Sequence, residues 1–384
     1  MNLIYKRYKQ YINSQHATGK YRKLPDFFCD RRKSYLNFSS NDYLGLSSDS
    51  GIIEAAVNTA RFYGTGATGS RLLSGNLDIF EQLELQIAKD KKRESALIFN
   101  SGFQANITTL STLLDKSILK QTPLVFFDKL NHASLYQAIA LSSPDLVRYR
   151  HCDMRHLTFL LERYIDDKRP KFIVSETLFG MDGDIAPIDD LVRLSKKFHA
   201  FLYLDEAHST GILGENGYGL STSVDLEGIS CLIMGTFSKA IGCSGGYVAC
   251  DKLVKEFLLN KAKGFIYSTA NSPMVIGAVK ESWKRIKNCY KERKHLKSLG
   301  DFLRSLLVRE GFDIGFSTTH IVPIIIKDER KVLDISRKLL DKNILTSCIR
   351  PPSVPIGKSC IRIAICSYHN EVDLEYLVRV LRQL

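Results

Sequence analysis

The chain has 384 residues, of which 44% are hydrophobic and 25% charged, with 25 glycines and 10 prolines. This composition is typical of a globular protein and excludes disordered, collagen-like and coiled-coil chains. No apolar run approaches the roughly 20 residues of a membrane-spanning helix, and the first seven residues lack the apolar core of a secretory signal. We therefore expect a cytoplasmic protein with no membrane contact.

The net charge of +13 lies in two segments. Residues 1–34 carry +7 and residues 280–297 carry +6, so the remainder of the chain is neutral. Two local basic patches are more typical of a docking surface for an acidic partner than of a groove for nucleic acid. Charge alone leaves a second interpretation open, in which both segments are solvated helix faces that keep the protein soluble.

The nine cysteines indicate neither a disulfide framework nor a metal site. Their number is odd and no two of them form a C-x-x-C pair, whereas zinc sites use closely spaced ligand pairs. We expect reduced, mostly buried thiols and no bound metal.

Helix-length amphipathic segments alternate with short apolar runs along the chain. In chain order, helices are predicted at 52–63, 104–114, 134–141, 156–165 and 188–198, and strands at 95–100, 124–128, 147–150, 172–176, 201–205, 233–236 and 246–250. This alternation predicts an α/β fold with a mainly parallel sheet and helices on both of its faces.

The end of the chain has a different pattern. Residues 271–308 are predicted to form one long helical segment, followed by strands at 320–326 and 361–366 and helices near 329–342 and 370–383. We therefore predict an N-terminal arm at 1–45, a large α/β domain at 46–280, and a connecting helix with a small α+β domain at 281–384.

One glycine-rich motif lacks the context that its pattern requires. Residues 64–69 match the G-x-G-x-x-G fingerprint of dinucleotide sites, which needs a strand before it and a helix after it. Here a predicted helix precedes the motif and a loop follows it. We reject a dinucleotide site and predict a glycine-rich substrate loop.

Three side chains at the ends of predicted strands indicate a cofactor. Asp205 ends one strand, His208 lies three residues further on, and Lys239 follows the next strand. Taken singly, the aspartate is a helix cap and the lysine a solvated surface group. Together at one edge of a sheet they converge on one crevice. They suit pyridoxal 5′-phosphate (PLP), which needs a lysine amine for a Schiff base and a carboxylate beside its pyridine nitrogen.

Two further turns fit the same cofactor. Residues 100–103 lie between a strand and a helix, where free backbone N–H groups can hold a phosphate. His132 follows another strand and can stack on the cofactor ring. The alternative for His132 is a residue at a helix N-terminus that is satisfied by local hydrogen bonds.

The sequence resembles the α-oxoamine synthases, PLP enzymes of fold type I (the aspartate-aminotransferase-like class). The resemblance runs from about residue 35 to the C-terminus, through motifs at 35–46, 68–76, 131–135, 181–184, 205–208 and 236–239. It implies a large PLP-binding α/β domain, a small C-terminal α+β domain and a homodimer with a shared active site.

The resemblance also assigns roles at the cofactor. Lys239 would bind PLP and move the substrate α-proton, and Asp205 would pair with the pyridine nitrogen. His208 would bond the ring oxygen, and His132 would stack on the ring and help to protonate the ketoacid. The backbone of Gly102 and Phe103, with Thr236, would hold the phosphate. Ser268 and Thr269 would reach the phosphate of the partner subunit.

The substrates follow from the same resemblance. Residues 349–355 are most similar to the branch that condenses L-alanine with a pimeloyl thioester of carrier protein or coenzyme A in biotin biosynthesis. Arg362, with Asn41 beside it, would clamp the alanine carboxylate, and Arg22, Arg350 and Ser353 would face the acyl substrate. Two alternatives stay open: a glycine-using member of the family, similar to 2-amino-3-ketobutyrate coenzyme A ligase, and a non-catalytic basic binding protein on this scaffold.

Three positions depart from the family pattern. Gly180 replaces a usual serine beside the ring and removes one predicted contact. Phe80 stands where a histidine is common, and Ser353 replaces a threonine but keeps its hydroxyl.

Overall fold

A computed structural model describes residues 2–24, 35–351 and 353–384. The chain divides into two compact units. Unit 1 consists of Met1–Ser40, Met181–Gly183 and Leu296–Leu384, and unit 2 consists of Asn41–Gly180 and Asp184–His295. Among the residues discussed from the sequence, residues 25–34 of the first basic segment, which include Cys29, and Pro352 lie outside the described part of the chain.

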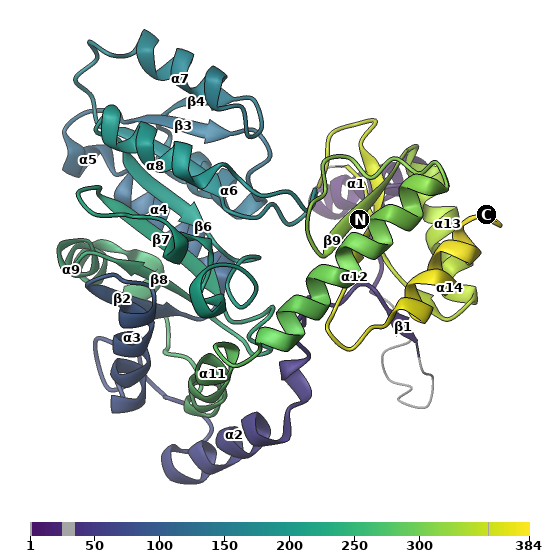
Figure 1. The fold of residues 1–384 in the computed structure, drawn as a ribbon. Helices are drawn as coiled ribbons and strands as arrows, with labels where there is room; N and C mark the ends of the chain where they lie inside the picture. Colours follow the sequence, from purple (N-terminus) through teal and green to yellow (C-terminus); the bar gives the residue numbers. More distant parts are fainter. Residues whose placement is uncertain (1, 25–34, 352) are drawn as a thin grey trace. The chain divides into compact units, whose positions relative to one another are not determined.

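A seven-stranded sheet forms the centre of unit 2, and Figure 1 shows most of its strands. Its strands are β2 (Ser95–Phe99), β3 (Leu124–Asp128), β4 (Asp145–Tyr149), β5 (Lys171–Glu176), β6 (Phe201–Asp205), β7 (Cys231–Thr236) and β8 (Gly246–Cys250), in the order β2-β8-β7-β6-β5-β3-β4. The pairs from β7 to β4 are parallel, and β8 is antiparallel to both of its neighbours. The predicted mainly parallel α/β sheet is confirmed.

Helices pack on both faces of this sheet because alternate residues of a buried strand point to opposite faces. The helices of unit 2 are α2 (Ser50–Tyr63), α3 (Asp78–Asp90), α4 (Gly102–Leu113), α5 (Lys116–Leu119), α6 (Ala133–Ser142), α7 (Met154–Arg163), α8 (Ile188–Lys197), α9 (Lys252–Lys261), α10 (Lys263–Ile266) and α11 (Pro273–Ile286). Val125 and Phe127 of β3 belong to one apolar cluster with α4, α6 and α9. Leu124 and Phe126, one residue out of phase, pack with α7 and α8. The carboxyl ends of five strands lie at one edge of the sheet, because β3, β4, β5, β6 and β7 run parallel.

The predicted single helical stretch at 271–308 is wrong. Helix α11 ends at Ile286, and α12 (Tyr290–Arg309) begins four residues later. The backbone N–H groups of Asn288 and Cys289 donate to carbonyls only three residues back, those of Arg285 and Ile286. Such tight turns interrupt the α-helical ladder, which a hydrophobic period cannot reveal.

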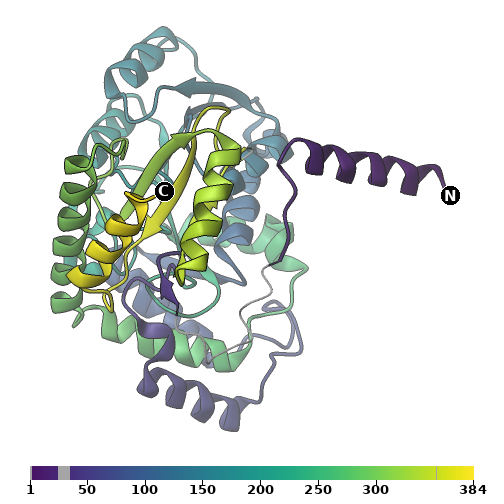
Figure 2. The same ribbon diagram turned by 90° about the vertical axis from the view of Figure 1, so that its right-hand side faces the viewer.

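Unit 1 contains a three-stranded antiparallel sheet, β11-β12-β9, and a separate parallel pair, β1 with β10. The elements are α1 (Leu3–Ala17), β1 (Leu36–Asn37), β9 (Ile321–Lys327), α13 (Glu329–Asp341), β10 (Ile344–Leu345), β11 (Ser347–Ile349), β12 (Ser359–Ala364) and α14 (Glu371–Leu381), with most of α12. The strand predicted at 361–366 begins two residues earlier and ends at Ala364, whose N–H donates to the carbonyl of Phe38. Helix α1 buries none of its residues and projects away from the small sheet (Figure 2).

Two further sequence expectations concern the chain as a whole. Among the described residues, no helix is both long and apolar enough to cross a membrane. The eight described cysteines are all free thiols, and five of them are buried.

Candidate functional site

The carboxyl ends of the parallel strands in unit 2 carry most of the predicted cofactor residues. Asp205 is the last residue of β6, Thr236 the last of β7, and Lys239 lies in the turn that follows β7. Strand β2 runs in the same direction as β7, since both are antiparallel to β8. Its end therefore leads into Gly102, the first residue of α4, at the same edge of the sheet.

Asp205 is a buried carboxylate held by a hydrogen bond to each oxygen. The backbone N–H of Ala207 donates to Oδ1 at 2.9 Å, and Nδ2 of Asn106 donates to Oδ2 at 2.7 Å. Asp205 is 3% exposed. Two donors at fixed positions determine the plane of the carboxylate, which pairing with one ring nitrogen requires.

His208 is buried in the loop after β6 and is held by an aromatic hydroxyl. The hydroxyl of Tyr43 lies 2.7 Å from Nδ1 of His208 and donates to Oδ1 of Asn41 at 3.0 Å. Tyr43 is fully buried, so this contact fixes the imidazole from behind. Sequence reasoning selected Asn41 and His208 separately and missed the tyrosine that joins them.

His132 caps the N-terminus of α6, which is the local role weighed against ring stacking. Its Nδ1 accepts from the backbone N–H of Ser134 at 3.2 Å and lies 2.8 Å from the Ser134 hydroxyl. Desolvation lowers the pKa of His132, the nearby Lys239 ammonium lowers it further, and Asp205 opposes both. The ring still reaches solvent, so capping and ring stacking are compatible.

Lys239 is partly buried, and its charge also acts on a carboxyl group that sequence reasoning missed. Burial raises the pKa of Glu176, at the end of β5, well above its ordinary value, the charge of Asp205 adds to this shift, and Lys239 opposes it. A buried carboxyl group whose pKa is shifted in this way by a neighbouring aspartate and lysine is typical of the perturbed clusters found at active sites.

The N-terminus of α4 has the form of a phosphate site. Ser101 caps the helix by accepting from the N–H of Gln104 at 3.0 Å, and a Cβ on Gly102 would lie 3.1 Å from Cβ and Oγ1 of Thr236. The missing side chain keeps this helix end open, and Thr236 stands beside it. Phe103 is 51% exposed, and its backbone N–H lies in the first turn of α4.

Ser268 and Thr269 lie beside the same helix end of their own chain. Ser268 accepts from Nε2 of Gln104 at 2.9 Å, and the carbonyl of Thr269 accepts from Nδ2 of Asn100 at 2.9 Å. Their predicted contact with a partner subunit stays a prediction.

Gly180 leaves space that the imidazole of His208 occupies. A Cβ at this position would lie 2.0 Å from Nε2 of His208. The serine expected from the family pattern therefore has no room beside His208 as it is placed here. Phe80, the second departure, is fully buried and packs under the guanidinium of Arg71 at 4.5 Å.

We expect Gly180→Ala to displace His208 and break its contact with Tyr43. Overpacking of this kind costs about 1–3 kcal/mol, so the variant should unfold at lower urea concentration and bind PLP more weakly. Gly66→Ala is the matched control, because a Cβ there meets nothing closer than 4.0 Å. Equal urea midpoints and equal PLP dissociation constants for the two variants would show that His208 is not held in this position.

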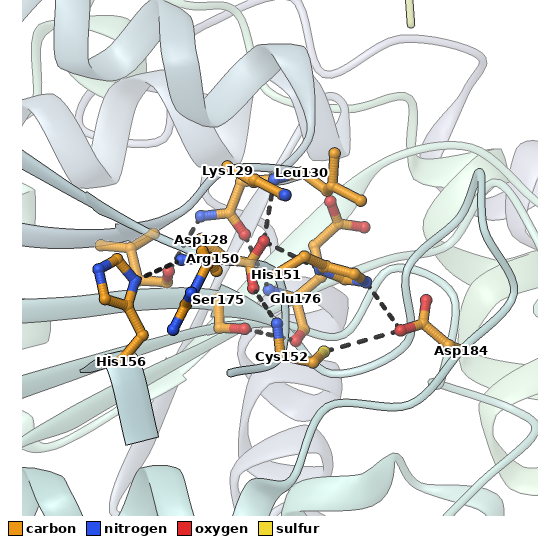
Figure 3. Close-up of polar contacts among 12 residues, drawn as sticks. Asp128, Lys129, Leu130, Arg150, His151, Cys152, His156, Ser175, Glu176 and Asp184 are labelled. Atoms are coloured by element: carbon orange, nitrogen blue, oxygen red, sulfur yellow. Dashed lines mark hydrogen bonds and ion pairs between the residues drawn. The ribbon is translucent and has the colours of Figure 1, made fainter. Parts of the chain in front are cut away.

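A clamp of three side chains holds the turn that leads to His132 (Figure 3). Nδ1 of His151 lies 3.0 Å from Oδ1 of Asp128, and its Nε2 lies 2.8 Å from Oδ2 of Asp184. Asp128 also accepts from the N–H of Leu130, at 2.9 Å, and from that of Cys152, at 2.9 Å. Burial alone would lower the pKa of His151, but the hydrogen bonds to the two carboxylates outweigh it and raise the pKa to about 12. By position alone Asp128, His151 and Cys152 could hold a metal ion, yet both imidazole nitrogens already bind carboxylates.

The predicted substrate residues at the chain ends lie in unit 1. Nη2 of Arg22 donates to Oγ of Ser353 at 3.2 Å. Arg350 donates from Nη1 to the carbonyl of Gly19 and from Nη2 to that of Tyr21 at 2.8 Å, so it anchors the segment that carries Arg22. Arg362 is buried in β12. Burial lowers the pKa of the neighbouring His320 to about 3, and the charges of Arg362 and Arg304 contribute.

The sequence matches a known protein family and its curated relatives over most of its length. The model of the aminotransferase class I and II family matches residues 33–381. Proteins named "Putative 8-amino-7-oxononanoate synthase" are 44% identical in Paramagnetospirillum magneticum, over 90% of this chain and 87% of the relative, and 42% identical in Bacillus anthracis, over 96% and 93%. The chain belongs to the class I and II aminotransferases, in their α-oxoamine synthase branch.

Solved structures of this branch share the fold. A serine palmitoyltransferase from S. paucimobilis with a bound PLP–myriocin adduct has a TM-score of 0.89 at 26% identity and covers 100% of this chain and 98% of its own. An 8-amino-7-oxononanoate synthase from Francisella tularensis has a TM-score of 0.77 at 29% identity, over 91% and 97%. The predicted fold type, enzyme class and PLP cofactor are confirmed.

The residues of unit 2 fit this cofactor. Gly102 supplies an open helix end for the phosphate, and Asp205 supplies an oriented carboxylate for the pyridine nitrogen. Gly180 makes room for the imidazole of His208. Lys239 supplies the amine.

Proposed function

We propose that the chain condenses L-alanine with a pimeloyl thioester to give 8-amino-7-oxononanoate, carbon dioxide and a free thiol, a step of biotin biosynthesis. The observation that carries the proposal is identity of about 40% over nearly the whole chain to relatives of that name. The predicted acyl-substrate site is supported by two contacts: Arg22 donates to Ser353, and Arg350 donates to the backbone next to Arg22.

In the proposed reaction, the residues of the site either bind the cofactor or substrate or transfer a proton. Bound PLP supplies an electron sink for negative charge that develops on the carbon next to the substrate amine. Lys239 removes the α-proton, Asp205 keeps the pyridine nitrogen protonated, and His208 fixes the ring oxygen. His132 covers the ring and helps to return a proton after carbon dioxide leaves. Arg362 binds the substrate carboxylate, and Asn41 assists it.

The balance of the reaction needs no further reactant. The α-carbon of alanine loses a proton and forms a carbon–carbon bond to the thioester carbonyl, and the thiolate leaves and takes up a proton. The resulting β-ketoacid loses its carboxylate as carbon dioxide, and the same carbon is then protonated. The protein itself has to supply acid–base groups and the amine of Lys239.

We further propose that the enzyme is a homodimer of cytoplasmic subunits. Thr269 and its neighbour Tyr267 are exposed on unit 2, next to the open end of α4. Their exposure beside a phosphate site is what a contribution to a partner's cofactor requires. Sedimentation of the PLP-bound enzyme tests this, and a monomer with full activity would contradict it.

The proposed substrates are tested by the visible spectrum of the PLP-bound protein and by product analysis. L-Alanine should change the cofactor band, and subsequent pimeloyl-coenzyme A should give 8-amino-7-oxononanoate by mass spectrometry. A response to glycine with turnover of a shorter acyl-coenzyme A, and none with alanine, would support the glycine-using alternative instead. A protein that binds no PLP would contradict both.

Two basic segments support a carrier-protein thioester as the acyl donor. In the segment from α11 to α12, the exposed lysines are Lys284, Lys287, Lys291, Lys294 and Lys297. Residues 2–24 contain six basic and no acidic side chains. Acyl carrier proteins are acidic, so opposite charges would speed their encounter with either segment.

For this donor we expect a steep dependence on salt. Raising the ionic strength should lower kcat/KM for the carrier substrate by about tenfold or more, since steering of this kind is screened within a Debye length, and change kcat/KM for the coenzyme A substrate far less. Lys287→Glu should reproduce the loss at low salt, and Lys196→Glu is its control, because Lys196 is exposed on α8. Equal salt dependence for both donors would remove the support.

A further inference from the structure

We infer that Asn106 is a positioning residue that holds both Asp205 and His132 in the orientations PLP requires. Asn106 lies in the second turn of α4 and is 1% exposed. From one Nδ2 group it donates to Oδ2 of Asp205 at 2.7 Å and to Oγ of Ser134 at 2.8 Å. The inference rests on the proposed roles of Asp205 and His132, and it is independent of which substrates are used.

The amide of Asn106 is fully occupied, which fixes its direction. Its Oδ1 accepts from the hydroxyl of Tyr203 at 2.9 Å, and that hydroxyl lies 2.9 Å from Oγ1 of Thr109. A flipped amide would place oxygen against the Asp205 carboxylate and nitrogen against the Tyr203 donor. The donor side of Asn106 therefore faces the carboxylate.

The second bond of Nδ2 extends the same control to the ring-stacking residue. Ser134 is fully buried, and its hydroxyl lies 2.8 Å from Nδ1 of His132. If that hydroxyl donates to Nδ1, its oxygen accepts from Asn106 and Nε2 of His132 carries the imidazole proton. One side chain in α4 thus connects the end of β6 to the first turn of α6.

The apolar surroundings of Asn106 make a side-chain amide destabilising unless the amide forms hydrogen bonds. The flanking residues of α4, among them Ala105, Leu110 and Leu113, belong to the apolar cluster on this face of the sheet. A buried amide without hydrogen-bond partners destabilises the folded protein, whereas an apolar residue would pack there without that loss. A polar group at this place is explained by the groups it orients.

Asn106→Asp is the sharpest test, because it keeps the size of the side chain and removes the donor. The introduced carboxylate would face Asp205 and raise the pKa of the pair. We expect the PLP dissociation constant at pH 8 to rise at least tenfold and to recover as the pH is lowered to 6, where one carboxyl can carry a proton. Fluorescence titration of the apoprotein with PLP measures this without any substrate.

One further variant and its control separate the two hydrogen bonds that Nδ2 of Asn106 donates. Ser134→Ala removes only the connection to His132, so PLP affinity should stay within about twofold while the pH profile of kcat shifts. Thr112→Val is the matched control in the same helix, since Thr112 is buried and its hydroxyl donates to the backbone carbonyl of Thr108. This variant should change stability but neither readout.

The outcomes distinguish this inference from the proposed site itself. If Asp205→Asn weakens PLP binding and Asn106→Asp binds PLP like the parent at pH 8, the positioning role is wrong and the site stands. If Asp205→Asn has no effect on PLP binding, the proposed cofactor site is wrong. A loss in Asn106→Asp that is the same at pH 6 and pH 8 would show a structural effect only and would overturn the inference.

Discussion

Lys239→Ala is expected to keep the fold and to bind PLP only without a covalent bond, with turnover at least about 1,000-fold below that of the parent. General acid–base catalysis alone contributes about 10²–10⁴-fold, and the variant also loses the amine that exchanges with the substrate amine. Because Lys239 is partly exposed in a turn, its truncation creates no large cavity. Single-turnover rates with alanine and pimeloyl-coenzyme A, together with urea unfolding, give the two measurements.

Chemical rescue separates the proton-transfer role of Lys239 from a structural one. A small primary amine added to the variant should restore part of the activity in proportion to its concentration, since it can enter the space the side chain left. Lys196→Ala is the matched control, because Lys196 is exposed on α8, in the same unit. Parent-like turnover in Lys239→Ala would exclude this lysine as the proposed base.

The sheet could be predicted because its strands are buried and short. The ranges 124–128, 201–205 and 246–250 coincide with β3, β6 and β8, where continuous apolar runs end at a polar residue or glycine. The break between α11 and α12 could not be predicted, because it depends on two local hydrogen bonds rather than on hydrophobic period. Pairing of β1 with β10 joins residues more than 300 positions apart and leaves no local signal.

The sequence revealed the residues predicted to contact PLP, because they lie at or just after strand ends. It did not reveal the residues that hold these side chains in place. Asp205 ends β6, and His208 and Lys239 lie in the loops after β6 and β7, where a polar side chain after an apolar run stands out. Asn106 lies within a helix and Tyr43 in a loop, and the site residues they contact are 99 and 165 positions away in the chain. Their hydrogen-bonding roles become visible only once the fold places them beside the end of β6 and the loop that follows it.

His151→Gln is expected to destabilise the protein by about 3–5 kcal/mol, the usual loss when one member of a buried charged pair is removed. Asp128 is fully buried and Asp184 is 8% exposed, so both carboxylates would stay in the protein without their cation. Because Asp128 also holds the turn before His132 through Leu130, PLP binding should weaken as well. Urea unfolding at pH 6.5 measures the first effect.

The pH dependence of this difference tests whether the imidazole is charged. The pKa of His151 is raised from 6.5 to about 12 in the folded protein, so its stabilisation is complete below pH 6.5 and is lost as the pH rises toward 12. The gap in unfolding free energy between parent and variant should therefore narrow from pH 6.5 to pH 9.5. His199→Asn is the control, since His199 is exposed with φ +50°, a conformation that asparagine tolerates. A gap that stays constant over this range would mean that His151 is neutral and that shape, rather than charge, holds the clamp.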